Sequence, residues 1–211
     1  MSSLVQRLSN GLHDLSLDLS QSQQNNLLDY LGMLSKWNKV YNLTSVREPD
    51  QMLNQHVLDC LAALPPLIQR FPNACELLDV GAGGGLPSVI FAIACPQWRV
   101  TAVDTVAKKA AFIQATAHSL ELPNLTAVHS RVENLQGQFD VVTCRAFATL
   151  KDFCEASHHL VKPQGWWLSL KAKLSSQEIS EVHKGIRIEE VLPILVPGVD
   201  VERCLVWLRQ A

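Results

Sequence analysis

Short apolar runs alternate with stretches of helical periodicity along most of this chain. Seven runs have the length and apolar character of strands: residues 77–80, 99–103, 125–128, 139–144, 166–170, 191–196 and 202–208. Apolar residues at helical spacing lie between several of these runs, at residues 89–95, 105–120, 150–160 and 176–184. Strands that alternate with helices predict an α/β fold with a mostly parallel sheet. The last two strands flank a short turn, 197–200, and predict an antiparallel pair at the edge of that sheet.

A long amphipathic helix is predicted before the first strand. Ser20 and Gln23 form a capping box, in which a hydroxyl and a glutamine three residues later satisfy backbone N–H groups at a helix start. After this box, apolar residues recur at helical spacing: Leu27, Leu28, Leu31, Leu34 and Trp37. Residues 1–19 are polar with scattered leucines and indicate another short helix.

A polar connection and a further helix complete this region. Residues 38–47 carry amide, hydroxyl and guanidinium groups, and fit either a solvated loop or a loop that faces a substrate. Pro49 suits the first turn of the next helix, which Pro65–Pro66 is expected to end. We therefore predict a helical region over residues 1–70 and an α/β domain over residues 71–211.

Four glycines, Gly81, Gly83, Gly84 and Gly85, lie between the first strand and its helix. Glycine lets the backbone turn sharply and lets a ligand approach without a Cβ in between. The second strand ends in Asp104, whose carboxylate can accept hydrogen bonds from the ribose hydroxyls of an adenosine. The combination predicts a nucleoside site, although the glycines alone would also fit a flexible loop.

The spacing of the glycines distinguishes between cofactors. Dinucleotide enzymes carry G-x-G-x-x-G, and the position of its third glycine holds Leu86 here. The sequence therefore disfavours a nicotinamide-dependent oxidoreductase, which would share the fold. A G-x-G-x-G turn followed by an acid at the end of the second strand resembles the S-adenosylmethionine site of the class I methyltransferases.

Polar residues follow the ends of the predicted strands. Asp104, Arg131, Glu133, Arg145 and Lys171 each lie at or just past such an end. The carboxyl ends of parallel strands meet at one edge of a sheet, where ligands bind in open α/β folds. These residues are therefore expected to converge on one site although they are far apart in sequence.

Composition narrows the function classes. The 211 residues are 47% hydrophobic and have a mean hydropathy of +0.09, which is typical of a globular protein. The net charge of −2 gives no general attraction to nucleic acid, so RNA binding would need a local basic patch. We find no apolar run of membrane-spanning length and no signal peptide, and therefore expect a cytoplasmic protein without membrane contact.

The cysteines and histidines show no metal-ligand pattern. The six cysteines form no C-x-x-C pair, and the seven histidines lack ligand spacing. We therefore predict reduced thiols and no metal site.

Six segments together resemble a known family, the bacterial small-subunit ribosomal RNA guanine-N7 methyltransferases called RsmG or GidB. They are residues 36–39, 41–47, 56–59, 79–87, 130–133 and 145–148. They extend from the helical region to beyond the fourth strand, and the chain beyond Lys173 adds little to the resemblance. The family has a class I S-adenosylmethionine-dependent methyltransferase fold, which is Rossmann-like with a mostly parallel seven-stranded sheet.

The resemblance implies a reaction and a set of contacts. A methyl group would pass from S-adenosylmethionine to N7 of a guanine in the decoding-region loop of 16S ribosomal RNA, in the small ribosomal subunit. The cofactor would be bound by the glycine turn with Leu86, by Asp104, by Val132 and Glu133 at the adenine end, and by Arg145. The predicted fold, independently of the resemblance, gathers several loops and helix starts on one side, and we expect RNA contacts there from Asn42, Arg47, Arg145 and Lys171. The basic rim on that side also includes Lys36, Lys39, Lys108, Lys109 and Arg131. We expect a monomer.

Guanine N7 has an unprotonated lone pair at neutral pH, and the sulfonium is an activated donor. Catalysis then depends on positioning, and we assign no acid or base residue. Two other base-methylating classes fit less well. Cys144 would be the nucleophile of a cytosine-C5 enzyme, but Thr143 stands where those enzymes have proline; the N/D-P-P-Y/F signature of amine methylation is absent. The sequence also leaves open the alternative that the chain is a non-catalytic RNA-binding assembly factor.

Overall fold

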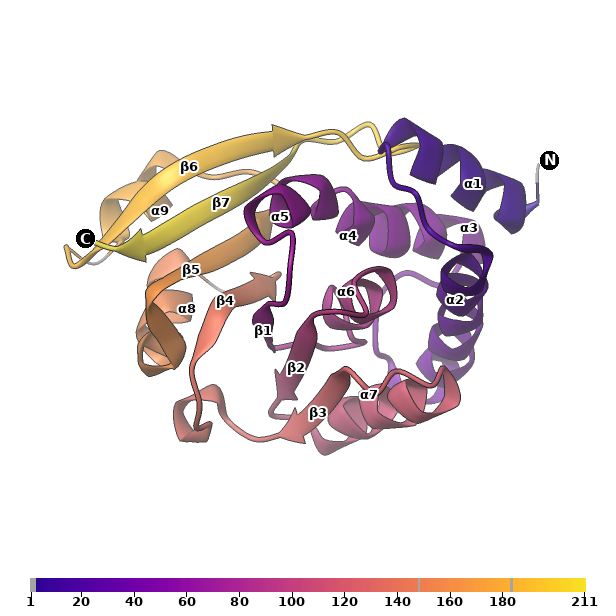
Figure 1. Cartoon of the computed structure of the whole chain (residues 1–211), viewed down its shortest axis with the longest axis horizontal. Helices are drawn as coiled ribbons and strands as arrows, with labels where there is room; N and C mark the ends of the chain where they lie inside the picture. The colour runs from indigo at the N-terminus through magenta and orange to yellow at the C-terminus, as the bar shows by residue number, and fades with distance from the viewer. Residues whose placement is uncertain (1–2, 148, 183) are drawn as a thin grey trace.

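A twisted seven-stranded sheet forms the centre of the computed structural model, which describes residues 3–147, 149–182 and 184–211 (Figure 1). The strand order is β3-β2-β1-β4-β5-β7-β6. Neighbours from β3 to β5 are parallel, and β7 is antiparallel to both β5 and β6. The predicted fold is thus confirmed. The strands are β1 (Glu76–Val80), β2 (Arg99–Asp104), β3 (Leu125–His129), β4 (Phe139–Arg145), β5 (Val161–Lys171), β6 (Ile186–Ile194) and β7 (Arg203–Gln210).

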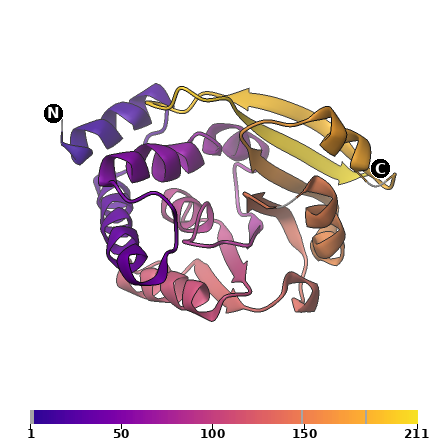
Figure 2. The ribbon, with the colours of Figure 1, turned by 180° about the vertical axis from the view of Figure 1, so that it is seen from behind.

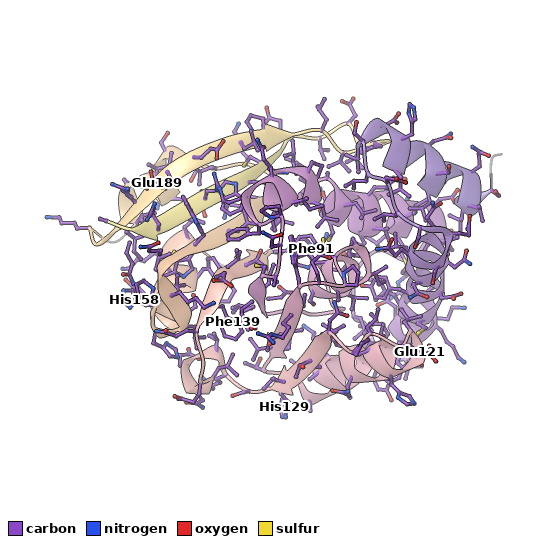
Figure 3. The ribbon with its side chains drawn as sticks, viewed as in Figure 1. Phe91, Glu121, His129, Phe139, His158 and Glu189 are labelled. Carbon is purple, nitrogen blue, oxygen red and sulfur yellow. The ribbon has the colours of Figure 1, made fainter. Side chains whose placement is uncertain are left out.

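Helices cover both faces of the sheet, and successive strand residues alternate between them. Leu77 and Val141 lie in one buried cluster, whereas the next residues, Leu78 and Val142, lie in the other. Burial on both faces explains why the parallel strands are apolar runs. Side chains fill the layers, with Phe91 of α6 fully buried (Figure 3). The elements after β1 are α6 (Ser88–Ala94), α7 (Ala107–Ser119), η2 (Val132–Asn134), α8 (Leu150–Ser157), η3 (His158–Leu160) and α9 (Ser176–Glu181).

The helices before β1 pack on the same face as α6 and α7. They are α1 (Leu4–Asp14), α2 (Gln21–Tyr41), α3 (Pro49–Met52), η1 (Leu53–Leu58), α4 (Asp59–Leu61) and α5 (Leu64–Arg70). Their apolar residues belong to the same buried cluster as residues of α6, α7 and the sheet. The β6–β7 connection also reaches them, because Nδ2 of Asn54 donates to the Gly198 carbonyl at 3.1 Å (Figure 2). The domain boundary at residue 70 stays a prediction.

The capping box begins α2 as predicted. Ser20 Oγ accepts from the Gln23 N–H at 3.3 Å, and Gln23 Oε1 accepts from the Ser20 N–H at 2.9 Å. One turn of this helix then ties it to the glycine turn, because the buried Tyr30 hydroxyl donates to the Gly84 carbonyl at 2.7 Å. The helix therefore helps to build the site.

Some local predictions are wrong. Pro65–Pro66 does not end a helix but begins α5, where the missing N–H of proline needs no partner. The turn expected at residues 163–165 lies inside β5, whose register with β4 shifts between Phe139 and Val141. The strand predicted to begin at residue 191 begins at Ile186; its Pro193 is tolerated because β6 is an edge strand.

Some predictions concern residues that lie outside the described part of the chain. The helix expected to reach residue 184 ends at Glu181, and His183 lies outside the described residues, as do residues 1–2 and Ala148 of the last family segment. In the described part of the chain, no helix is long and apolar enough to cross a membrane. No group of potential ligands for a metal ion occurs among those same residues, and all six cysteines are free and buried.

We predict that Gly85→Ala destabilises the fold. Gly85 has φ +81°, and an added Cβ would overlap the Cγ2 methyl of Val89 in α6. The left-handed backbone and the overlap together should lower the free energy of unfolding by about 2 kcal/mol or more, measured by urea denaturation. Gly32→Ala is the matched control, since Gly32 lies in α2 with no atom near the added Cβ. It should raise stability by up to about 1 kcal/mol; equal effects of the two variants would contradict the prediction.

Candidate functional site

The turn after β1 has a backbone that only glycine adopts easily. Gly81, Gly83 and Gly85 have φ of +70°, +59° and +81°. The N–H groups of Gly81 and Ala82 both donate to the Val103 carbonyl, at 2.9 and 3.1 Å, which ties the turn to β2. The glycine pattern therefore specifies a shape of the backbone in addition to room for a ligand.

Two buried carboxylates hold this turn. Asp104 accepts from the Gly83 N–H at 2.9 Å through Oδ2 and from the Val106 N–H at 2.8 Å through Oδ1. The Asp104 side chain thus ties the glycine turn to Val106, the residue that precedes α7. Lys109 Nζ lies 3.9 Å from Asp104 Oδ2, so one of the two lysines in the first turn of α7 pairs with this acid.

Asp79 is the second carboxylate, and sequence reasoning did not assign it a role. Its Oδ2 accepts from the Ser88 N–H at 3.1 Å, which connects the end of β1 to the start of α6. Its Oδ1 is buried without a partner among the described residues, and burial raises the pKa of this carboxyl to about 6. Asp79 stands just before the glycines in the sequence, and this position was the signal from which a role could have been predicted.

A cavity of about 320 Å³ opens beside the glycine turn, at the carboxyl ends of the strands. Asp104 and Glu133 give it acidic groups, and Val132 and Phe147 give it apolar walls. A carboxylate that can accept from ribose hydroxyls, next to apolar walls that suit a purine, fits a nucleoside. The lining residues are Val80, Gly81, Val103, Asp104, Thr105, Val106, Lys109, Ser130, Arg131, Val132, Glu133 and Phe147.

Four residues predicted to bind the cofactor do not line this cavity: Gly83, Gly85, Leu86 and Arg145, of which Arg145 lines a second cavity described below. Gly83 contributes its N–H to Asp104, and Gly85 packs against Val89 behind the turn. Leu86 is 6% exposed and belongs to the hydrophobic core. The contact of all four with a cofactor stays a prediction, and the structure gives each of the first three a part in shaping the turn.

A second cavity of about 320 Å³ adjoins the ends of β4, β5 and β7. Phe147 lines both cavities, and Ala146 before it has a left-handed φ of +61°, a rare backbone for a residue with a Cβ. Cations dominate the polar lining of this second cavity: Arg145, Lys171, Lys173 and Arg203, with Asp59 as the acid. This charge favours a phosphate-bearing ligand.

Arg145 is fixed by residues of the helical region. Its Nη1 donates to the Gln55 carbonyl at 3.0 Å and to Asp59 Oδ2 at 3.1 Å, and its Nη2 lies 3.3 Å from His56 Nδ1. Burial and the neighbouring Arg145 lower the pKa of His56 to about 4, so this imidazole is neutral at neutral pH. Arg145 therefore lines the second cavity rather than the first.

The loop at residues 42–47 is joined to this cluster through Thr44. Its hydroxyl lies 2.7 Å from His56 Nε2, and the buried Asn38 side chain accepts from the Thr44 N–H at 2.8 Å. Asn42, with φ +50°, ends α2, and both Asn42 and Arg47 are exposed. Thr44 thus fixes the middle of the loop to His56, which contacts Arg145, whereas the contact of Asn42 and Arg47 with RNA stays a prediction.

The predicted basic rim divides into two groups. Arg145, Lys171 and Lys109 have acidic partners, and the Lys171–Glu178 pair is 2.7 Å long and largely buried. The other five residues are exposed: Lys36, Lys39, Arg47, Lys108 and Arg131. The first group can fix geometry, whereas the second can attract a polyanion.

Sequence reasoning missed four charged or aromatic residues of the second cavity: Asp59, Phe147, Lys173 and Arg203. Asp59 and Phe147 lie in segments that carry the family resemblance, which was the available signal, whereas Arg203 had none. Cys144, considered as a nucleophile, is 1% exposed, and burial raises the pKa of its thiol to about 12. Such a thiol stays protonated at neutral pH and does not act as a nucleophile.

Known proteins resemble this chain in fold or in sequence. Solved structures similar in fold include TrmN from Thermus thermophilus, with a TM-score of 0.56, 16% identity and coverage of 75% of this chain and 53% of that one. The glycopeptide N-methyltransferase MtfA complexed with (S)-adenosyl-L-methionine gives a TM-score of 0.59 at 12% identity, covering 74% of this chain and 95% of that one. At this identity the likeness concerns the fold alone.

Sequence relatives are much closer. Proteins named ribosomal RNA small subunit methyltransferase G are 50% identical in Acidovorax ebreus (strain TPSY), over 98% of this chain and 96% of the relative, and 52% identical in Acidovorax sp. (strain JS42), over 96% and 93%. The family model GidB, described as rRNA small subunit methyltransferase G, matches residues 23–206. The chain therefore belongs to the GidB family of rRNA small subunit methyltransferases.

Proposed function

We propose that this protein transfers the methyl group of S-adenosylmethionine to N7 of a guanine in 16S ribosomal RNA. The observation that carries the proposal is the pair of cavities that meet at Phe147, one with the chemistry of a nucleoside site and one cationic. Membership of the family and the names of its relatives support ribosomal RNA as the substrate.

The first cavity fits the adenosine part of the cofactor. Asp104 uses one lone pair of each oxygen for a backbone N–H, which leaves lone pairs for ribose hydroxyls. Val132 and Phe147 would contact the adenine, and Glu133 lies at the same end. When bound, S-adenosylmethionine supplies an activated methyl group on a sulfonium.

The second cavity fits the target nucleotide. Its cations would contact phosphate, and Phe147 and Leu170 offer apolar surface to a base. A base in a folded RNA has to leave its stack to enter, at a cost of a few kcal/mol. The 42–47 loop, in which Asn42 and Arg47 are exposed and Thr44 is fixed to His56, would stabilise the extruded base.

The reaction needs no proton transfer from the protein, because guanine N7 attacks through a free lone pair. The chain's residues therefore act by alignment. Arg145 cannot bind O6 and N7 of the guanine together, as arginine does in DNA readers, since N7 must stay free. Its donors would instead contact O6 or a phosphate. We further infer a monomer that works in the cytoplasm, where its ribosomal substrate is found; sedimentation of the purified protein would test the first point.

The direct test is to map N7-methylguanine in 16S ribosomal RNA from cells with and without the gene. We expect one guanine to lose its methyl group in the deletion and to regain it when the purified protein and S-adenosylmethionine are added to that RNA. Binding of NAD instead of S-adenosylhomocysteine in calorimetry would indicate an oxidoreductase. RNA binding without any methyl transfer would indicate an assembly factor.

Asp104→Ala should weaken the cofactor far more than RNA. Loss of a hydrogen-bonded acid costs about 1–3 kcal/mol, so S-adenosylhomocysteine affinity in calorimetry should fall roughly 5- to 150-fold. RNA affinity in a filter-binding assay should stay near that of the parent. Glu155→Ala, an exposed acid on α8, is the control and should change neither. An equal loss of both affinities would contradict the assignment of Asp104 to the cofactor.

RNA attraction should depend on the exposed group of the rim. Arg47→Ala combined with Arg131→Ala removes two cations, which should reduce the slope of log K against log salt by about 1.4 on single-stranded RNA. Arg99→Ala with Arg187→Ala is the matched control, because these exposed arginines lie at the starts of β2 and β6, away from the carboxyl edge. Equal slopes for the two double variants would show that RNA does not bind at the exposed rim residues.

A further inference from the structure

Asp59 joins two arginines that come from distant parts of the chain. Its Oδ2 accepts from Arg145 Nη1 at 3.1 Å, and its Oδ1 accepts from Arg203 Nε at 2.6 Å. The Asp59 side chain is 7% exposed, against 20% and 23% for the two arginines. One buried carboxylate therefore fixes two guanidinium groups in the wall of the second cavity.

The helix around Asp59 has an unusual turn that aims this carboxylate. Residues 53–58 form the π-helical turn η1, and the Asp59 N–H bonds back to the Asn54 carbonyl, five residues earlier. One extra residue in a turn rotates the following side chains by about 100° around the helix axis. The same turn directs the Gln55 carbonyl and His56 to Arg145. Such turns frequently occur at functional sites.

The energetics of buried ion pairs indicate that Asp59 orients the two arginines and adds little to the stability of the fold. A buried ion pair gains little net stability, because desolvation offsets the attraction between its charges. Each arginine also keeps a donor for a ligand: Arg145 Nε and Arg203 Nη2 have no hydrogen-bond partner within residues 3–147, 149–182 and 184–211. The bonds to Asp59 therefore restrict the directions in which these remaining donors can point.

We propose that Asp59 is a positioning residue for methyl transfer, which orients Arg145 and Arg203 toward the target nucleotide in the second cavity. This inference rests on the proposed function, since it takes the nucleotide as the occupant of that cavity. Asp59 acts through the two arginines and does not itself contact the reacting atoms.

A positioning role and a purely electrostatic role of Asp59 predict different values of kcat for Asp59→Asn. The substitution removes one negative charge from a cationic cavity, so charge alone would tighten RNA binding, lower KM and leave kcat unchanged. Loss of orientation instead lowers kcat, because misplacement by about 1 Å costs on the order of 100-fold in rate. A steady-state analysis that separates kcat from KM therefore distinguishes the two.

The experiment measures methyl transfer to 16S ribosomal RNA by the full-length chain. For Asp59→Asn we expect kcat to fall roughly 10- to 100-fold, with KM for RNA equal to or below that of the parent. Affinity for S-adenosylhomocysteine should not change, since Asp59 does not line the first cavity. Asp50→Asn is the matched control, an exposed aspartate of α3 that pairs with Arg7, and should behave like the parent. An unchanged kcat for Asp59→Asn would overturn the inference.

A second variant, Arg203→Lys, tests the inference even if Asp59→Asn does not fold. Arg203→Lys keeps the charge and loses the bond geometry of the guanidinium, so it should also lower kcat. The effect of Asp59→Asn in that background should be smaller than in the parent, and independent, multiplying effects would overturn the inference. A parent protein without methyl transfer would refute the proposed function itself, whereas an active parent with an indifferent Asp59 refutes only the positioning role.

Discussion

The left-handed backbone between β1 and α6 is the constraint on which the rest of the site depends. Gly81, Gly83 and Gly85 each have a φ that costs other residues about 1–2 kcal/mol, and the N–H groups of the turn need acceptors. Asp104 accepts from the Gly83 N–H, and the Val103 carbonyl accepts from Gly81 and Ala82. Asp79 accepts from the Ser88 N–H at the start of α6. The same bonds bring an acid, an open turn and the start of α7 together around one cavity. The hydrogen bonds that fold the turn are thus the same bonds that shape the candidate cofactor cavity.

A second constraint is the charge gathered at the carboxyl edge. Four cations line one small cavity, and they would repel one another unless some were paired. The chain meets this need with acids from other elements: Asp59 from the helical region and Glu178 from α9. The helices before β1 are therefore part of the site, and Tyr30 and Thr44 tie them to the glycine turn and to His56.

The division of the basic residues explains how a chain with net charge −2 can act on RNA. In the proposed function, the paired, half-buried cations would hold fixed positions near the reacting atoms, whereas the exposed cations would attract phosphate at longer range and respond to salt. Different residues would then carry attraction and alignment. The alignment depends on buried hydrogen bonds, which salt screens much less than surface charges.

The sequence by itself determined the features that arise between near neighbours. The period of the apolar residues specified the strands and helices, Ser20 and Gln23 specified a helix start, and the glycine spacing with Asp104 specified a cofactor site. These signals are local, because each depends on the backbone conformation of a few adjacent residues.

Only the tertiary structure decided the partners of the charged residues. Asp59 meets Arg145 across 86 positions and Arg203 across 144, and no periodicity connects them. Pro65–Pro66 could end a helix or begin one, and Lys171 could face solvent or a carboxylate, until packing settled each case. Sheet register and helix packing determine such pairs, and a single sequence carries no local signal of either.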